Sequence, residues 1–227
     1  MLAKKYKSEV VSIENSFEGI YTVEFAPQRG NYKFLPGQFL HVAIDVDYDG
    51  VGQWPESRCF SMQSSPDEKH IKITYAVKGD FTGLMEETLK VGSEVWLKLP
   101  YGDLFQQNHD KSNSVFIAGG TGITPFLSLF GSSLFEEYKE PKIYLGFRSR
   151  EYNIYQEELD KIKNQRPFVK TYYEDTDGVL DIEAIYRDNG GAANYFISGP
   201  PSMIKAFRNF FIEKGVRAQQ ILTDDWE

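Results

Sequence analysis

Short runs of alternating apolar and polar positions recur through the first hundred residues. Residues 71–75, for example, read Ile-Lys-Ile-Thr-Tyr, and this period of two places the apolar side chains on one face of a half-buried strand. Comparable runs occupy residues 6–13, 20–25, 39–44 and 95–97, with turn-forming pairs such as Pro36-Gly37 between them. One helical interval, 82–89, is inserted before the last run. Several short strands with one helix predict a small antiparallel β-barrel.

The pattern changes after about residue 105. Strand-like runs at 115–118, 142–147, 168–172 and 194–197 alternate with helical patterns at 125–135, 155–163, 182–186 and 201–214. Such alternation is typical of parallel strands joined by crossover helices. The polar segment 106–113 separates the two patterns. We therefore predict two domains, an antiparallel β-barrel over residues 1–106 and an α/β doubly wound parallel sheet over residues 112–227.

Charge and composition narrow the classes of function. The 227 residues include 25 Lys and Arg against 33 Asp and Glu, a net charge of -8, which disfavours nucleic acid and anionic lipid as partners. The uncharged stretch 112–135 approaches the ~20 residues that a spanning helix needs. Three Gly, two Thr and a Pro break the middle of this stretch. A strand, a glycine turn and a helix fit it better, so we predict no membrane span.

The residues that commonly bind metals are few and scattered. Cys59 is the single Cys, too few for a disulfide framework, a cysteine-ligated iron–sulfur cluster or a Cys-rich zinc site. His41, His70 and His109 lack the spacing of metal ligands, so we predict no metal site. The first residues lack the apolar core of a signal peptide, and we expect a cytoplasmic location.

A glycine-rich segment, Gly119-Gly120-Thr121-Gly122-Ile123-Thr124-Pro125, follows a predicted strand and opens a predicted helix. Glycines there let the backbone approach a pyrophosphate, and the helix N-terminus offers free N–H groups and positive dipole character. Thr124 suits the N-cap, and Pro125 suits the first turn, where no N–H is needed. The segment predicts dinucleotide binding; the alternative is a tight turn without a ligand.

A second segment, Arg58-Cys59-Phe60-Ser61, places a guanidinium, an aromatic ring and a hydroxyl on one strand. These groups suit a ligand that carries a phosphate and a flat ring with hydrogen-bonding atoms. Taken alone, the segment fits an ordinary strand that bears a surface Arg better than it fits a ligand site.

Six motifs in a fixed order identify a family resemblance that covers nearly the whole chain. They are Pro36-Gly37-Gln38-Phe39, Arg58-Cys59-Phe60-Ser61, Gly79-Asp80-Phe81-Thr82, Pro100-Tyr101-Gly102, Gly119 to Pro125, and Ser198-Gly199-Pro200-Pro201-Ser202-Met203. In this order they resemble the motifs of the ferredoxin–NADP reductase superfamily. The resemblance implies a flavin-binding barrel followed by a domain that binds a nicotinamide nucleotide.

The resemblance implies a role for each motif. Arg58 would hold the flavin phosphate, Phe60 would lie on the isoalloxazine ring, and Ser61 would hydrogen-bond near the reactive N5. FAD is expected rather than FMN, with Thr82 and the N–H groups around Gly79 taking its pyrophosphate. Further flavin contacts are expected from Cys59, Tyr75, Val77 and Phe81. The dinucleotide contacts are expected from Gly119, Gly120, Thr121, Gly122, Thr124, Pro125, Arg148, Gly199 and Pro200, and Ser61 and Ser198 occupy the catalytic positions.

The chain departs from the family pattern at two motif positions. Phe60 replaces the usual Tyr, which keeps the stacking face and drops a phenol contact. Ser198 replaces the usual Cys beside the nicotinamide and is nearly isosteric with it. Near the end of the chain, Trp226 corresponds to an aromatic residue that shields the flavin in many relatives; the alternative is a surface tail.

The choice between NADH and NADPH depends on the segment after the third strand of the second domain. Arg148 occurs in relatives of both preferences and does not discriminate. Glu174 and Asp175 stand near the place where NADPH-selective relatives carry a Ser-Arg pair. Carboxylates there would repel a 2′-phosphate and could bond a free ribose hydroxyl, so we lean towards NADH. The alternative is a solvated loop.

The resemblance predicts an FAD-dependent NAD(P)H oxidoreductase. Hydride would pass from the nicotinamide to flavin N5, and electrons would leave to a separate acceptor such as a ferredoxin, a flavodoxin or an oxygenase component. Two alternatives stay open: a flavin reductase that uses flavin as a diffusible substrate, and an electron-transfer subunit of a larger complex.

Overall fold

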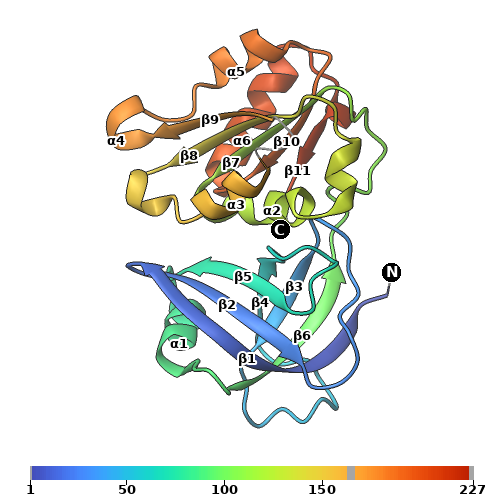
Figure 1. The fold of residues 1–227 in the computed structure, drawn as a ribbon, viewed down its shortest axis with the longest axis vertical. Coiled ribbons are helices and arrows are strands. Elements are labelled where there is room, and N and C mark those ends of the chain that lie inside the picture. The colour runs from blue at the N-terminus through green and yellow to red at the C-terminus, as the bar shows by residue number, and fades with distance from the viewer. Residues whose placement is uncertain (1, 163–166, 225–227) are drawn as a thin grey trace. The chain divides into compact units, whose positions relative to one another are not determined.

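The chain forms two compact units in the computed structural model, which describes residues 2–162 and 167–224 (Figure 1). The first unit comprises Met1–Asp103 together with Leu127–Ser132, and the second comprises Leu104–Phe126 and Ser133–Glu227. The division into domains at 1–106 and 112–227 stays a prediction of the sequence.

The first unit is a six-stranded antiparallel sheet in the order β4-β3-β6-β1-β2-β5, which curls into a near-barrel (Figure 1). Its strands are β1 (Lys4–Phe17), β2 (Ile20–Pro27), β3 (Phe39–Ala43), β4 (Arg58–Ser61), β5 (Ile71–Ala76) and β6 (Glu94–Tyr101). Alternation buries one face of each strand, as in β5, where Ile71 and Ile73 are fully buried and Lys72 is not. Helix α1 (Asp80–Thr88) adds Phe81 and Met85 to this core. The antiparallel β-barrel predicted from the sequence is confirmed as a fold class.

The second unit contains a five-stranded parallel sheet in the order β11-β10-β7-β8-β9. The strands are β7 (Ser114–Gly119), β8 (Lys142–Phe147), β9 (Phe168–Tyr173), β10 (Asn194–Ser198) and β11 (Ile221–Thr223). The chain enters at the central strand β7, proceeds to one side through β8 and β9, and then returns to β10 on the other side. The order therefore reverses between β7 and β10, which is where open α/β sheets bind ligands. The doubly wound α/β fold is confirmed, with β11 as an additional strand.

Helical segments connect these strands and cover both faces of the sheet. They are η1 (Gly120–Ile123), α2 (Thr124–Phe130), η2 (Ser133–Glu137), η3 (Arg150–Tyr152), α3 (Gln156–Lys161), α4 (Glu174–Asp177), α5 (Ile182–Asn189), α6 (Pro201–Glu213) and η5 (Ala218–Gln220). The continuous helix predicted over 125–135 is wrong. It ends at Phe130, and the Ser132 hydroxyl donates to the carbonyl of Leu129 at 2.7 Å, which closes the turn before η2. Residue 163, the end of the helix predicted over 155–163, lies outside the described residues.

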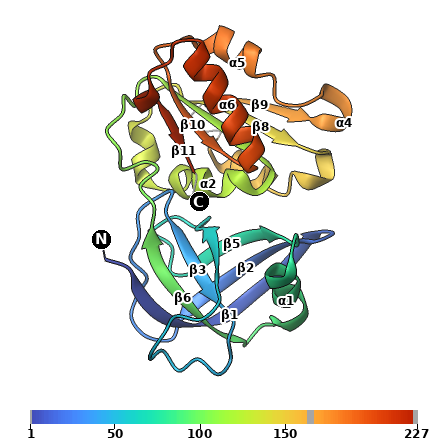
Figure 2. The same ribbon diagram turned by 180° about the vertical axis from the view of Figure 1, so that it is seen from behind.

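Neighbouring residues of the central strands face opposite layers of the second unit. Val115 and Ile117 pack on the face that α6 covers, together with Phe207 and Phe211, and Figure 2 shows α6 lying along that face. Phe116 points the other way and stacks on Phe196, with ring centroids 5.1 Å apart. Both faces are therefore buried, which explains why β7 and β10 read as continuous apolar runs.

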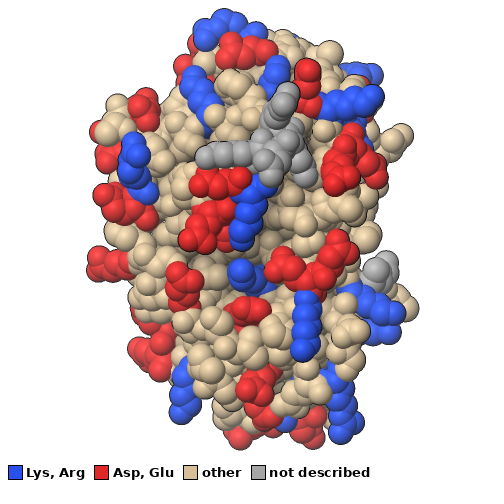
Figure 3. Space-filling model, in the orientation of Figure 1, with Lys and Arg blue, Asp and Glu red and all other residues tan. Residues whose placement is uncertain are grey.

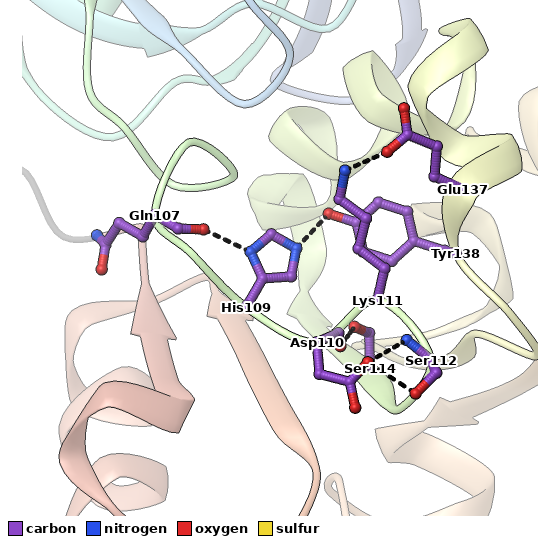
Figure 4. Close-up of polar contacts among 8 residues, drawn as sticks. All are labelled: Gln107, His109, Asp110, Lys111, Ser112, Ser114, Glu137 and Tyr138. Carbon is purple, nitrogen blue, oxygen red and sulfur yellow. Dashed lines mark hydrogen bonds and ion pairs between the residues drawn. The ribbon is translucent and has the colours of Figure 1, made fainter.

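A network of polar contacts holds residues 107–112, which precede β7, against the rest of the second unit (Figure 4). Nδ1 of His109 lies 2.7 Å from the carbonyl oxygen of Gln107, and Nε2 lies 2.7 Å from the Tyr138 hydroxyl. Lys111 pairs with Glu137, and burial lowers the pKa of His109. His109 is thus an anchor for this polar segment. Among residues 2–162 and 167–224, no group of three His, Cys, Asp or Glu side chains is placed to hold a metal ion.

Within the described part of the chain, no helix combines the length and the apolar character needed to cross a membrane. The longest, α6, has 13 residues. The cytoplasmic location stays a prediction.

The aromatic layer on the α2 face predicts a large effect of truncating its central ring. Phe116 is fully buried, and its ring lies 5.5 Å from that of Phe126 and 5.5 Å from that of Tyr138. Phe116→Ala should lower the free energy of unfolding by about 3–5 kcal/mol because it leaves a cavity. Phe168, which is 50% exposed, is the matched control. Phe168→Ala should lower the free energy of unfolding by less than about 1 kcal/mol. Urea unfolding followed by circular dichroism checks both, and equal losses would contradict this packing.

Candidate functional site

Strand β4 carries the first candidate site, in the first unit. Phe60 is half-buried against the barrel core, and its ring centroid lies 5.9 Å from that of Tyr75. Ser61 is almost fully buried. Tyr75 is itself 3% exposed, so its side chain belongs to the core, and its burial raises the pKa of the phenol.

Cys59 faces away from its neighbours because successive residues of a strand point to opposite sides. It lies directly opposite His41 in the β3–β4 pairing, with Sγ 3.5 Å from Nε2 and 3.6 Å from Nδ1 of that imidazole. Burial raises the pKa of Cys59. The thiol therefore lies on the opposite face of β4 from Phe60, and a contact between Cys59 and a ligand on the Phe60 face would come from its backbone.

Arg58, at the start of β4, has its guanidinium held by three contacts. One nitrogen lies 3.0 Å from a carboxylate oxygen of Glu56, another donates to the carbonyl of Ser57 at 2.9 Å, and the group lies 5.1 Å from the ring centroid of Phe81. Phe81 belongs to the first turn of α1. The cation of β4 is thus positioned beside the N-terminus of that helix.

The turn that opens α1 is held by its own threonine. The Thr82 hydroxyl accepts from the N–H groups of Lys78 at 2.9 Å and Gly79 at 3.2 Å, and it donates to the Gly79 carbonyl at 3.0 Å. A Cβ at Gly79 would meet nothing within 4 Å, so space is open beside the turn. Val77 is tied by its N–H to the carbonyl of Gly19 at 2.8 Å. The guanidinium of Arg58 and the N-terminal amides of α1 together form a donor set that fits a phosphate group.

The second candidate site lies in the second unit, where the loops after β7 and β10 meet. Ala118 and Ser198 pair across these strands, so both loops leave the sheet at the same edge. A Cβ on Gly122 would come within 2.5 Å of the Cα of Gly199. A Cβ on Gly119 would lie 2.9 Å from Sδ of Met203 and 3.1 Å from Pro200. Only glycine permits this approach of two backbones at the point where the strand order reverses.

The loop after β7 continues directly into helical turns. Residues Gly120–Ile123 form η1, and Thr124 already has helical dihedral angles, φ -55 and ψ -43. The Thr124 hydroxyl donates to the Thr121 carbonyl at 2.9 Å. The interpretation of Thr124 as the N-cap is therefore wrong, because that position belongs to Gly119 at the start of η1. Gly120, Thr121 and Gly122 are partly exposed, and Pro125 follows inside α2.

Ser198 ends β10 and is 2% exposed. Its hydroxyl donates to a carboxylate oxygen of Asp224 at 3.2 Å, and the Asp224 N–H donates to the carbonyl of Ile197 at 3.0 Å. The sequence reasoning missed Asp224 because it missed β11, the strand that brings this residue back to the sheet. Trp226, two positions further on, lies outside the described residues.

The loops after β8 and β9 are joined to each other beyond the same edge of the sheet. The Arg148 carbonyl accepts from the N–H of Asp175 at 3.2 Å, and the Arg148 guanidinium lies 5.8 Å from the ring centroid of Tyr152. Arg150, which the sequence reasoning also missed, lies 5.3 Å from the ring centroid of Tyr173. Cations and aromatic rings thus line these loops.

Carboxylates begin immediately after β9. Glu174, Asp175 and Asp177 lie in the short helix α4. Asp177 accepts from the N–H of Tyr173 at 3.0 Å, so its carboxylate is occupied, whereas Glu174 and Asp175 have exposed side chains. A ligand at this end of the sheet would therefore meet both signs of charge.

The amino-acid sequence is similar to a known protein family and to several known proteins. Residues 116–209 match the family described as the oxidoreductase NAD-binding domain. The chain is 28% identical over 238 residues to the reductase component of propane 2-monooxygenase from Rhodococcus jostii (strain RHA1), covering 96% of this chain and 62% of that protein. It is 25% identical over 222 residues to flavohemoprotein A from Dictyostelium discoideum, covering 89% of this chain and 55% of that protein. The chain thus spans less than two thirds of each of these relatives.

A solved structure shares the whole fold. The ferredoxin reductase in carbazole 1,9a-dioxygenase aligns with a TM-score of 0.79 at 23% identity, over 100% of this chain and 70% of that one. This likeness confirms the two-unit fold that the six sequence motifs predicted.

The contact between the two glycine loops generates a prediction. Gly122→Ala should force the loops apart, because the new Cβ would meet backbone atoms that have no side-chain freedom to yield. We expect the dissociation constant for NADH, measured by fluorescence titration, to rise by about tenfold or more. Gly191→Ala is the control, since the nearest atom to its Cβ is the Tyr186 hydroxyl oxygen at 3.6 Å. Unchanged NADH affinity in Gly122→Ala would contradict the placement of the nucleotide at these loops.

Proposed function

We propose that the chain is a member of the ferredoxin–NADP reductase superfamily and an FAD-dependent NAD(P)H oxidoreductase that delivers electrons to a separate acceptor, as its fold and its similarity to named reductases support. The observation that carries the proposal is the pair of glycine loops after β7 and β10, whose backbones touch at the strand-order reversal. When bound, FAD supplies a hydride acceptor at N5 and releases electrons singly to the next carrier.

Residues of the first unit would hold the flavin. Arg58, Thr82 and the amides that open α1 suit its phosphates, and the Phe60 side chain offers a ring for stacking. Ser61 would bond near N5 through a hydroxyl held in a nearly buried position. These assignments rest on the resemblance and on a donor set whose chemistry fits a phosphate.

Residues of the second unit would hold the nicotinamide nucleotide. The amides of Gly120 to Gly122 would face its pyrophosphate, and Gly199 and Pro200 would pass near the nicotinamide. Ser198 would be a positioning contact there, with its hydroxyl oriented by Asp224. Positioning is what direct hydride transfer requires most, because the donor and acceptor atoms must be brought close together in a site that excludes water.

We favour NADH over NADPH as the donor. The exposed carboxylates of Glu174 and Asp175 support this preference, since they would repel a 2′-phosphate. Arg148 and Arg150, held over tyrosine rings in the neighbouring loop, work in the opposite direction. Because these carboxylates and cations act in opposite directions, removing the carboxylates should shift the preference from NADH towards NADPH.

We propose an oxygenase component or a ferredoxin as the acceptor, with a flavodoxin as a further candidate of the same chemistry. The support comes from relatives whose names describe a reductase component of a monooxygenase and a ferredoxin reductase in a dioxygenase. Figure 3 shows Lys and Arg interspersed with Asp and Glu over the face in view, so docking on that face would rest on local charge pairs. A subunit without independent turnover remains an alternative, which co-purification of a stable partner would support.

A flavin reductase that releases its flavin is the second candidate. Two observations favour it: Phe60 lacks the phenol of the family Tyr, and the Arg58 cation already has a carboxylate partner. The absorbance spectrum of the purified protein separates the two candidates. A stoichiometric flavin band supports the first, whereas a colourless protein that reduces added flavin with NADH supports the second. Neither a flavin band nor reduction of added flavin would contradict both.

Arg58→Ala tests the flavin site. Removing a charged donor to the phosphate should raise the dissociation constant for FAD by about tenfold, near 1.5 kcal/mol, the lower end of the range for charged hydrogen bonds because this side chain is 51% exposed. Quenching of flavin fluorescence on binding measures this constant. Arg29→Ala makes the same change of charge at an exposed position in the same unit and should leave it unchanged. Equal FAD affinity in the two variants would remove Arg58 from the site.

The carboxylates after β9 test the choice of nucleotide. In Glu174→Gln with Asp175→Asn, the ratio of kcat/KM for NADPH to that for NADH should rise by about tenfold, because two like charges near the 2′-phosphate are removed. Glu183→Gln with Asp188→Asn in α5 makes the same change of charge and should leave the ratio as it is. An unchanged ratio in the first variant would place the 2′ position of the nucleotide elsewhere.

A further inference from the structure

The cation assigned to the flavin phosphate is bound by a carboxylate of the same chain. One guanidinium nitrogen of Arg58 lies 3.0 Å from a carboxylate oxygen of Glu56, and the two side chains are 51% and 71% exposed. A second nitrogen donates to the Ser57 carbonyl at 2.9 Å. Two of the nitrogens that would grip a phosphate are therefore already engaged.

Glu56 lies in the short segment before β4. The Trp54 indole N–H donates to the hydroxyl of Ser57 at 2.8 Å, which closes a short turn around Glu56. The guanidinium also lies 5.1 Å from the ring centroid of Phe81, in the first turn of α1. The Glu56 carboxylate thus contacts the guanidinium of Arg58. That guanidinium lies against the first turn of α1, where a phosphate would bind.

Glu56 and a phosphate would compete for the same donors. A guanidinium grips a phosphate best through two N–H groups in parallel, and such a contact at Arg58 has to displace Glu56, Ser57 or both. An exposed ion pair contributes only about 0–1 kcal/mol, so the displacement is feasible but lowers the net affinity. A displaced carboxylate that stays nearby also repels the phosphate.

We propose that Glu56 weakens flavin binding by competing with the flavin phosphate for Arg58. This inference rests on the function proposed above and adds a determinant of how firmly the flavin is held. A flavin held against such a competitor exchanges faster than one gripped by a free guanidinium. The strength of the competition by Glu56 therefore determines whether the protein keeps its flavin bound or exchanges it with free flavin.

The opposite role for Glu56 predicts the opposite result. If its carboxylate served only to hold the guanidinium in the orientation that the phosphate needs, removing the charge would leave Arg58 less ordered. The flavin would then bind more weakly in Glu56→Gln. Competition and preorganisation are thus distinguished by the sign of one measurement.

The test is the dissociation constant for FAD of the full chain after removal of bound flavin, measured by quenching of flavin fluorescence. Glu56→Gln should bind FAD about three- to fivefold more tightly than the wild type, the fold-change that corresponds to the upper part of the range for an exposed ion pair. Glu9→Gln, at an exposed position in β1, makes the same change of charge and should match the wild type. In an Arg58→Ala background, Glu56→Gln should have no effect, because the contested group is gone.

Equal or weaker FAD binding by Glu56→Gln would overturn the proposal, and so would a tightening that persists in the Arg58→Ala background. In both cases FAD binding by the wild type would leave the proposed function intact. A wild-type chain that binds no FAD would instead contradict the proposed function, and the role of Glu56 with it.

Discussion

The second unit depends on one close approach, that of the backbones at Gly122 and Gly199. The parallel sheet reverses its strand order between β7 and β10, so the loops after these strands leave from neighbouring positions and run into each other. No side chain fits between them. Gly120, Thr121 and Gly122 in the turn after β7 are partly exposed, and a turn lined by amides suits a pyrophosphate. The packing of these loops and the nucleotide binding proposed for them therefore depend on the same glycines.

The proposed function requires the first unit to bind a phosphate as well, and among its described residues this unit has no glycine loop of that kind at its candidate site. The phosphate donors that we propose there are one guanidinium and the opening of α1, brought together by the contact between Arg58 and Phe81. In a chain with a net charge of -8, carboxylates stand beside three of the proposed ligand contacts: Glu56 at Arg58, Asp224 at Ser198, and Glu174 after β9. We infer that these acids tune affinity and selectivity at sites whose attraction for anions comes from local donors.

Local patterns predicted the fold well, whereas the roles of the site residues stay predictions. Alternation and helical spacing identified the strands of both units because burial repeats with a fixed period. The three-residue strand β11 and the single turn α4 were missed because they are too short to show a period. Contacts that depend on tertiary register, such as Ser198 with Asp224 and Arg150 with Tyr173, have no signature in the sequence. The pairing of the Cys59 thiol with the His41 imidazole likewise emerges only from the packed sheet.

The most direct measurement is a single-turnover reaction of the FAD-loaded protein with NADH under anaerobic conditions, followed by the bleaching of flavin absorbance. We predict complete bleaching in proportion to the NADH added. Deuterium at the transferred position of the nicotinamide C4 should slow it, because the C–H bond breaks in the step observed. Bound FAD that remains oxidised with both NADH and NADPH would contradict hydride transfer as the function of this chain.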